Sequence, residues 1–372
     1  MPNCYLYNSY FIMGGYNFFQ TMRKGKSIFF LVMAISILVG CSKDKGGGTD
    51  LPVDPPVVLP TLPFSKGADV SWVTEMEASG RKFYNKAGVE TECMALMKSL
   101  GMNTIRLRVW VNPSPVWNDV NDVVAKAVRA KDLGMRLMIN FHYSDSWADP
   151  GKQTKPAAWN DLGVQALRTE LGNHTRTVLN ALKSAGVTPD WVQVGNETND
   201  GMLWPNGRAS LVGGMINYAA FITEGYNAVK TVFPSARVIV HLSNGFDNAL
   251  YQWNIGGLIA NGAKFDVIGL SLYPNASNWS TFNQQCLANM NDLVARYKKE
   301  VMVLEVGMPW DQPVACRQFL TDLIGKVRSV AEGKGMGVLY WEPQSYGQWK
   351  GYTLGAFDNS GRPTEALDAF AD

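Results

Sequence analysis

Eight short apolar runs recur along residues 64–372, and most are followed by a segment in which apolar residues have helical spacing. The runs are Gly67–Val70, Thr104–Val109, Arg136–Phe141, Trp191–Gly195, Val238–His241, Val267–Ser271, Val301–Leu304 and Gly337–Tyr340. The helical segments are Glu90–Leu100, Val120–Leu133, Leu162–Ala185, Ile216–Val232, Phe282–Tyr297 and Arg317–Ala331. Strands alternating with helices form a parallel sheet covered by helices. Eight such units in this length predict an α/β fold, a (β/α)8 TIM barrel that forms a single domain.

A doubly wound parallel sheet is the alternative architecture for this alternation. That fold normally carries a glycine-rich phosphate-binding loop after an early strand. The first run ends in Gly67-Ala68-Asp69 and supplies no such loop. Gly101, Gly134 and Gly186 each follow an apolar helical stripe, where a helix commonly ends on a left-handed glycine. The barrel is therefore preferred, and it requires polar residues at the carboxyl ends of the strands.

The amino-terminal residues are typical of an export signal. Three cations precede an apolar run, Ile28–Val39, of the length found in secretory signal peptides. The run ends in Leu38-Val39-Gly40-Cys41, which resembles a bacterial lipobox and predicts lipidation at Cys41. An uncleaved membrane anchor is the alternative, although the run is short for a membrane span. We expect residues 1–41 to be a signal region, with translation starting at Met22.

Residues 42–63 are rich in glycine and proline and predict a tether that leads into the domain at 64–372. The tether begins Ser42-Lys43-Asp44, which resembles the export tag of some gram-negative surface lipoproteins. We therefore expect an outer-membrane or cell-surface lipoprotein that meets the membrane only through its N-terminal lipid anchor.

Charge and cysteine usage exclude several classes of protein. The chain has 34 Lys+Arg and 32 Asp+Glu; removing the first 41 residues, which hold three of these cations and no acid, leaves 31 against 32 and a net charge of −1. Nucleic-acid binding needs a clustered basic face, so none is expected. The five cysteines form no CxxC motif and the three histidines lie far apart, so we expect no metal site, disulfide framework or cofactor. Nothing suggests an obligate partner chain, and we expect a monomer.

Polar and aromatic residues crowd the predicted strand ends, as a barrel site requires. In chain order they are Asp69, Arg106, Trp110, His142, Asp145, Trp147, Asn196, Glu197, Asn244, Tyr273, Glu305, Trp341 and Glu342. Trp204 and Trp310 lie in loops that follow two of these strands. We expect these residues to form one substrate-binding site that contains two catalytic members.

Glu197 and Glu305 are the candidate catalytic pair, because each follows an apolar run that holds its carboxyl rigidly and shields it from water. Hydrolysis of a glycosidic bond needs one carboxylic acid to protonate the leaving oxygen and one carboxylate to attack the sugar, about 5 Å apart when configuration is retained. We expect apolar walls and the neighbouring charge to raise the pKa of Glu197 and make it the acid. Glu305 must stay ionised, and Arg106 and Tyr273 are its expected donors. Asn196 is expected to hold a sugar hydroxyl.

Tryptophan residues are the second feature of the predicted site. The chain has 12 Trp, and seven fall in predicted strand-end loops, where indole faces suit the C–H faces of pyranose rings. Some of these rings will pack loop on loop instead, and we expect three or four to touch sugar. Trp191, at a strand start, and Trp253, in a helical segment, are expected to be core residues. Asp69, Asp145, Asp200 and Glu342 are competing acids, and Asp145 is expected to orient a neighbour or bind a hydroxyl.

Several strings carry a family resemblance. They are Gly67–Ser71, Asn103–Pro113, Phe141–Gln153, Gly195–Glu197, Gly201–Gly207, His241-Leu242, Asn244-Gly245, Ser271–Pro274 and Tyr340–Pro343. Together they resemble glycoside hydrolase family 53, the endo-β-1,4-galactanases, over residues 64–372. The resemblance implies a (β/α)8 barrel that hydrolyses β-1,4-galactan, the side chains of pectin called type I arabinogalactan, with retention of configuration. It implies Glu197 as acid/base and Glu305 as nucleophile. It also implies that the −1 subsite is lined by Arg106, His142, Asn196, Tyr273 and Trp341.

The sequence departs from the family pattern after Glu305. Val306 stands where the family often has Thr, and only Met308–Val314 precede the next helix, where some members carry an acid-rich calcium loop. We therefore expect no calcium site there. Two other functions stay open: a barrel glycosidase acting on another β-1,4-glycan such as mannan, xylan or glucan, and a glycan-binding surface lipoprotein without catalysis.

Overall fold

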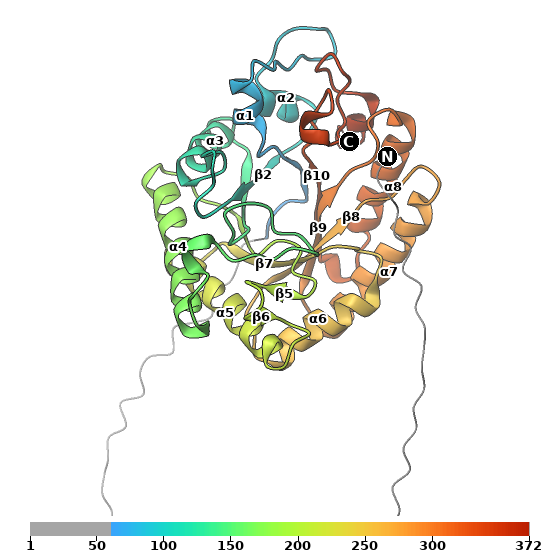
Figure 1. Ribbon diagram of the computed structural model, residues 1–372. Helices are drawn as coiled ribbons and strands as arrows, with labels where there is room; N and C mark the ends of the chain where they lie inside the picture. Colours follow the sequence, from blue (N-terminus) through green and yellow to red (C-terminus); the bar gives the residue numbers. More distant parts are fainter. Residues whose placement is uncertain (1–60, 372) are drawn as a thin grey trace, which may run out of the picture. The chain divides into compact units, whose positions relative to one another are not determined.

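The computed structural model describes residues 61–371, and their longer strands close into a barrel (Figure 1). The barrel strands are β1 (Ser65–Asp69), β2 (Thr104–Val109), β3 (Arg136–Phe141), β4 (Trp191–Val194), β7 (Arg237–Leu242), β8 (Val267–Leu272), β9 (Glu300–Val306) and β10 (Gly335–Trp341). Their order around the barrel is β1-β10-β9-β8-β7-β4-β3-β2, and each neighbouring pair is parallel. Because β1 pairs with both β2 and β10, this sheet has no edge. The predicted (β/α)8 barrel is confirmed, and the doubly wound sheet is excluded.

Helices surround the strands as an outer ring (Figure 1). They are α1 (Val73–Ala78), α2 (Cys93–Ser99), α3 (Val120–Asp132), α4 (Val164–Ser184), α5 (Gly214–Val232), α6 (Asn248–Ala260), α7 (Trp279–Tyr297) and α8 (Pro313–Arg328). Short 3-10 helices span Ala157–Trp159, Ala331–Gly333, Trp349–Gly351 and Glu365–Phe370. An antiparallel hairpin that the sequence did not predict, β5 (Gly201–Met202) with β6 (Gly207–Arg208), lies between β4 and α5.

The ends of the helices follow local backbone rules. Gly101, Gly134 and Gly186 have φ of 93°, 69° and 69°, so all three glycines that were expected to end helices are left-handed. Helix α8 begins at Pro313, four residues before the predicted start at Arg317. Proline suits the first turn of a helix, because the amide it lacks would have had no intrahelical acceptor there.

The barrel interior is filled in layers. An apolar cluster of buried side chains comes from successive strands: Met138, Trp191, Ile239, Val267, Met302, Leu304, Met336 and Leu339. One or two residues further along the strands, the inward side chains become polar, with Arg106, Asn140, Gln193 and His241 all buried. The apolar plug therefore supports a polar layer at the carboxyl ends of the strands.

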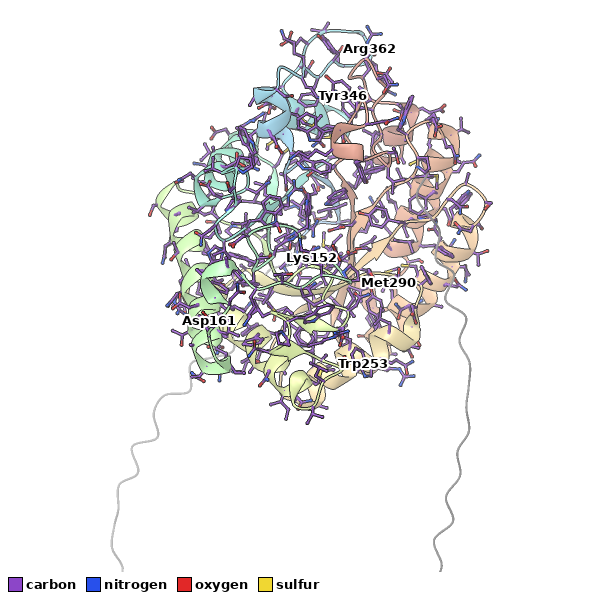
Figure 2. The ribbon with its side chains drawn as sticks, viewed as in Figure 1. Lys152, Asp161, Trp253, Met290, Tyr346 and Arg362 are labelled. Carbon is purple, nitrogen blue, oxygen red and sulfur yellow. The ribbon has the colours of Figure 1, made fainter. Side chains whose placement is uncertain are left out.

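The two tryptophans expected in the core have different outcomes. Trp191 is fully buried inside the barrel, as predicted. Trp253 is 45% exposed on α6, at the rim of the ring in Figure 2, so that prediction was wrong. Its neighbours along the helix, Tyr251, Asn254, Ile255 and Leu258, form the buried face instead. The apolar residues of α6 are too evenly distributed for the sequence to show which face is inward.

Several predictions concern residues outside 61–371. The start at Met22, the lipidation of Cys41 and most of the tether lie there and stay predictions. Within residues 61–371, no helix combines the length and the apolar character needed to cross a membrane.

Gly225 lets α5 pack directly on β4, the strand that leads to Glu197. A Cβ atom at Gly225 would lie 2.5 and 2.9 Å from the two Cγ atoms of Val194. Gly325 in α8 is a matched helical glycine, since a Cβ there would meet nothing within 4 Å. The first position has no room for a methyl group and the second has.

We predict that Gly225→Ala lowers the free energy of unfolding by about 1–2 kcal/mol, because overpacking of the α5–β4 contact exceeds the gain in helix propensity. Gly325→Ala should leave stability unchanged or raise it by up to about 1 kcal/mol. Urea denaturation of both variants measures the difference, and equal stabilities would contradict the packing account.

Candidate active site

A cavity of about 270 Å³ opens at the carboxyl ends of the barrel strands. Its walls are His142, Trp147, Ala148, Asp149, Asn196, Glu197, Tyr273, Glu305, Trp341, Tyr352 and Leu354. These residues come from the ends of β3, β4, β8, β9 and β10 and the loops that follow them. Both candidate catalytic carboxyls therefore face one space, together with four aromatic side chains and a histidine.

Glu305 reaches the cavity because β9 contains an irregularity. Leu270 of β8 is paired with Val303 of β9, but the next residue, Ser271, is paired with Glu305, so Leu304 is an extra residue. The side chain of Leu304 belongs to the apolar plug inside the barrel. In a regular strand the following residue would point outward. The bulge turns Glu305 inward as well, which is how two consecutive side chains of β9 face the barrel interior.

Glu305 is held by two donors. A guanidinium nitrogen of Arg106 lies 2.7 Å from Glu305 Oε1, and the hydroxyl of Tyr273 donates to Oε2 over 3.0 Å. These are the two groups that the sequence analysis expected. Burial, with a smaller contribution from the charge of Asp69, raises the pKa of Glu305 above its usual value, and the charge of Arg106 and the hydrogen bonds from Tyr273 and Arg106 oppose this rise. With a cation and a hydroxyl donor on its oxygens, Glu305 is the member of the pair that keeps its negative charge.

Glu197 lies in a sharply turned segment after β4. Gly195 and Glu197 have φ of 84° and 45°, so two residues of this turn are left-handed. The Glu197 carboxyl accepts one short hydrogen bond, 2.6 Å, from the hydroxyl of Ser271. Burial, followed by repulsion from Glu305, raises the pKa of Glu197 to about 8. Near neutral pH the proton shared by the two carboxyls therefore resides on Glu197.

A short relay orients that hydroxyl. The Ser271 hydroxyl gives its hydrogen to Glu197, so its oxygen accepts from His241, and in the neutral ring Nδ1 is then the acceptor. This nitrogen lies 3.0 Å from the Gln193 amide nitrogen and 3.3 Å from the Asn196 carbonyl oxygen. His241 Nε2 then carries the hydrogen and donates to the oxygen of Ser271 over 2.8 Å. Burial, with the charge of Arg106, depresses the pKa of His241 well below its usual value and keeps it neutral. Ser271 thus uses its own hydrogen for Glu197.

Asn196 and His142 are fixed in the cavity wall by buried donors. The carbonyl oxygen of the Asn196 side chain accepts from Arg106 at 3.0 Å and from Asn140 at 3.1 Å, and its nitrogen donates to the backbone oxygen of Ala148 at 2.9 Å. The backbone nitrogen of Ala148 donates to His142 Nδ1 at 3.0 Å. Burial and the guanidinium of Arg108 hold the pKa of His142 well below its usual value, so His142 is a neutral hydrogen-bonding group.

The aromatic wall rests on a buried arginine. The guanidinium carbon of Arg108 lies 4.3 Å from the ring centroid of Trp147, with Trp72 and Trp110 at 5.2 and 5.4 Å. Arg108 is held by Glu342 at 2.5 Å. A cation surrounded by indole faces is attracted to each of them, and the interaction is strongest where water is excluded. The position of Trp147 in the cavity wall is therefore tied to the Arg108–Glu342 ion pair.

The structure divides the candidate site residues into three groups. The cavity wall contains Glu197, Glu305, His142, Trp147, Asn196, Tyr273 and Trp341. Below it lie Asp69, Arg106 and Glu342, which are fully buried. These three were expected to bind substrate, and that role stays a prediction: none of them is part of the cavity wall, Arg106 forms ion pairs with Asp69 and Glu305, and Glu342 forms one with Arg108. Trp110 also stands behind the wall, in contact with Trp147 at 5.2 Å.

The remaining four candidates lie away from this cavity. Asp145 accepts backbone hydrogens of Asn112 and Ala157, so it orients neighbouring loops. Trp204 donates to the backbone of Asp200 and is covered by Arg208 at 4.5 Å. Asn244 is exposed and Trp310 is tied through its backbone to Thr353, and neither contributes to the cavity wall. The sequence marks them as strand-end residues but gives no direction for their side chains.

Four residues of the wall were not foreseen. Ala148 and Asp149 follow Trp147 directly, and they lie inside Phe141–Gln153, one of the strings that carry the family resemblance. Tyr352 and Leu354 come from the long loop after β10. The Tyr352 hydroxyl donates to the backbone oxygen of Trp341 over 3.2 Å, which folds the loop back over the strand end. The only sequence signal for Tyr352 as a wall residue was that it is an aromatic residue in a loop near the end of the domain. Within residues 61–371, no group of three His, Cys, Asp or Glu side chains could hold a metal ion.

A closed (β/α)8 barrel with a neutral and a charged glutamate in one aromatic-walled cavity defines the class of glycoside hydrolases. The chain belongs to glycosyl hydrolase family 53, whose family model matches residues 65–370.

Individual relatives agree with this family. The arabinogalactan endo-beta-1,4-galactanase of Humicola insolens is 34% identical over 299 residues, covering 75% of this chain and 89% of the relative. The arabinogalactan endo-beta-1,4-galactanase of Cellvibrio japonicus is 33% identical over 356 residues, covering 84% and 91%. Among solved structures, a fungal beta-1,4-galactanase superposes with a TM-score of 0.76 at 30% identity, covering 82% of this chain and 98% of that one.

We predict that Ser271→Ala raises the pKa of Glu197 above about 8, because the lost hydrogen bond had stabilised the ionised carboxylate. NMR titration of the glutamate carboxyl carbons, assigned with Glu197→Gln, measures the shift. Ser345→Ala is the control, since this serine is buried but its hydroxyl has no hydrogen-bond partner in the described part of the chain. An unchanged or lower pKa in Ser271→Ala would contradict the assignment.

Proposed function

We propose that this protein is a retaining endo-β-1,4-galactanase that cleaves β-1,4-galactan, including type I arabinogalactan side chains of pectin. The single observation that supports the chemistry most strongly is the unequal pair of carboxyls: Glu305 is bound by Arg106 and Tyr273, whereas among residues 61–371 the Glu197 carboxyl is bound only by the Ser271 hydroxyl. The choice of galactan is supported by the relatives from Humicola insolens and Cellvibrio japonicus, both named arabinogalactan endo-beta-1,4-galactanases.

In the first step, Glu197 donates its proton to the glycosidic oxygen while Glu305 attacks the anomeric carbon. The bond between that carbon and the leaving oxygen breaks, and a bond to a Glu305 oxygen forms on the opposite face. The proton on Glu197 neutralises the charge that would otherwise develop on the leaving sugar. Arg106 and Tyr273 hold the attacking Glu305 carboxylate in position until its bond to the anomeric carbon forms.

In the second step, Glu197 is ionised and accepts a proton from water as the water oxygen attacks the same carbon. The bond to Glu305 breaks, Glu305 regains its charge, and the configuration at the anomeric carbon is restored to that of the substrate. The pKa of Glu197 falls when Glu305 is esterified, because the repulsion from Glu305 disappears. The same residue can therefore act first as acid and then as base.

The sugar is held by the aromatic and amide groups of the wall. Trp147 and Trp341 offer indole faces to the C–H faces of the pyranose rings. The carbonyl oxygen of the Asn196 side chain is occupied by buried donors, and one hydrogen of its amide nitrogen goes to Ala148. The other amide hydrogen is left to donate to a sugar hydroxyl. Neutral His142 adds a second hydrogen-bonding group beside it.

We predict that Glu305→Gln abolishes release of reducing ends from β-1,4-galactan, with a loss of roughly a thousandfold or more, because no nucleophile remains. Asp145→Asn is the matched carboxyl control and should keep its activity on β-1,4-galactan, since Asp145 does not line the cavity. A panel of galactan, mannan, xylan and glucan tests the substrate. Cleavage of another glycan in preference to galactan would overturn the proposed specificity.

We also infer that the chain is exported and anchored through a lipid on Cys41. This proposal is supported by the cations, the apolar run and the Leu38-Val39-Gly40-Cys41 string. Cys41→Ala should move the protein from the membrane fraction to the soluble fraction. Cys4→Ala is the control, because Cys4 precedes the start expected at Met22. Membrane retention of Cys41→Ala, or release of Cys4→Ala, would contradict the assignment.

A further inference from the structure

Asn254 is a buried residue of α6 that contacts the segment carrying Glu197. Its side-chain nitrogen donates one hydrogen to the backbone oxygen of Thr198 over 2.9 Å and the other to that of Asn199 over 3.0 Å. Asn254 is fully buried and does not line the cavity. Its own carbonyl oxygen has no hydrogen-bond partner among residues 61–371. A buried amide that leaves its acceptor unpaired bears a cost, which its two donor contacts offset.

The segment that Asn254 contacts is strained. Glu197 is left-handed with φ of 45°, a conformation that costs a residue with a side chain on the order of 1–3 kcal/mol and persists only where neighbours impose it. Other contacts also hold the segment: the nitrogen of Thr198 donates to the oxygen of His241, and the Thr198 hydroxyl meets the Tyr218 hydroxyl at 2.6 Å. The backbone oxygen of Thr198 accepts from the nitrogen of Gly201 as well as from Asn254. The amide of Asn254 therefore binds the second and third peptide groups after Glu197, those that follow Thr198 and Asn199.

The direction of the Glu197 carboxyl depends on this clamp. Thr198 and Asn199 are the next two residues in the chain, so a shift of the peptide groups that follow them moves the far end of the turn, and this shift is passed along the backbone to Glu197. A general acid must lie within hydrogen-bond reach of the leaving oxygen, and a displacement of about 1 Å can cost as much as a hundredfold in rate. Glu305 is on β9 and has no contact with this clamp, so its position is independent of Asn254.

We propose that Asn254 is a positioning residue for proton transfer by Glu197. Its two hydrogen bonds keep the left-handed turn in the conformation that aims the acid at the leaving oxygen. The inference rests on the proposed glycoside hydrolysis and adds to it a residue of α6 that never touches substrate.

The test compares two substrates that differ in their need for the acid. Cleavage of β-1,4-galactan requires protonation of a poor leaving group, whereas a 2,4-dinitrophenyl β-galactobioside has a leaving group that departs without it. Asn254→Ala should lower kcat/KM on galactan by roughly tenfold or more and on the dinitrophenyl substrate by less than about threefold. The alkaline limb of the galactan pH profile, set by Glu197 near about pH 8, should also move.

Asn283 of α7 provides a matched control. It is fully buried, its nitrogen donates to the backbone oxygen of Phe319 over 3.1 Å, and its carbonyl oxygen likewise has no partner in the described chain. Its contacts lead to α8 and not to the catalytic segment. Asn283→Ala should lose stability as Asn254→Ala does, but it should lower kcat/KM on both substrates by the same factor and leave the pH profile in place.

Asn254→Leu gives a second variant of similar shape that has no donor hydrogens and adds no charge. It should show the same selective loss on galactan. Equal losses on the two substrates in both Asn254 variants, or failure of both to fold while Asn283→Ala folds, would assign the residue to stability alone and overturn the inference. If the unaltered protein cleaves neither galactan nor the galactobioside, the proposed function is what fails.

Discussion

The ion pairs of Arg106 are the interaction on which the site depends. Its guanidinium lies inside a closed barrel, fully buried, and bridges Asp69 at 2.9 Å and Glu305 at 2.7 Å. Burying one charge alone would be prohibitively costly, so the cation and its carboxylates must be present together. Because the cation is committed to Glu305, the second carboxyl, Glu197, is left without one and keeps a proton. One pairing inside the barrel thus divides two chemically identical side chains into a charged nucleophile and a protonated acid.

The barrel supplies the rigidity that this division requires. The apolar plug below the polar layer leaves no space for the buried charges to relax into, and the helices outside press on the strands that carry them, as α5 does on β4 at Gly225. Two local irregularities then aim the carboxyls: an extra residue at Leu304 and a left-handed turn at Glu197. Such departures from regular geometry persist where surrounding contacts over-determine them, and here the contacts come from Arg106, Tyr273 and the residues packed against the turn.

The fold, and the meeting of Glu197 and Glu305 in one cavity, could be predicted because they depend on local sequence. Alternating apolar runs and helical stripes define the barrel, and residues after each run must lie at its mouth. Depth within the barrel could not be predicted: Asp69 and Glu342 follow strands as Glu197 does, yet both are fully buried. The bulge at Leu304 depends on the register in which β9 pairs with β8. The residues of β9 alone do not determine that register. Tyr352 reaches the cavity through the path of a long loop, and the exposure of Trp253 reflects which face of an evenly apolar helix meets the sheet.

The central claim is that Glu305 forms a bond to the sugar while Glu197 moves the proton. The most direct measurement uses a 2-deoxy-2-fluoro galactobioside with a dinitrophenolate leaving group, which departs without acid help and leaves a slowly hydrolysed glycosyl-enzyme. Digestion and mass spectrometry of the labelled protein locate the sugar. The account predicts one sugar per chain, attached to the peptide that contains Glu305. A label on Glu197 or another residue, or active enzyme that forms no adduct and releases product of inverted configuration, would contradict it.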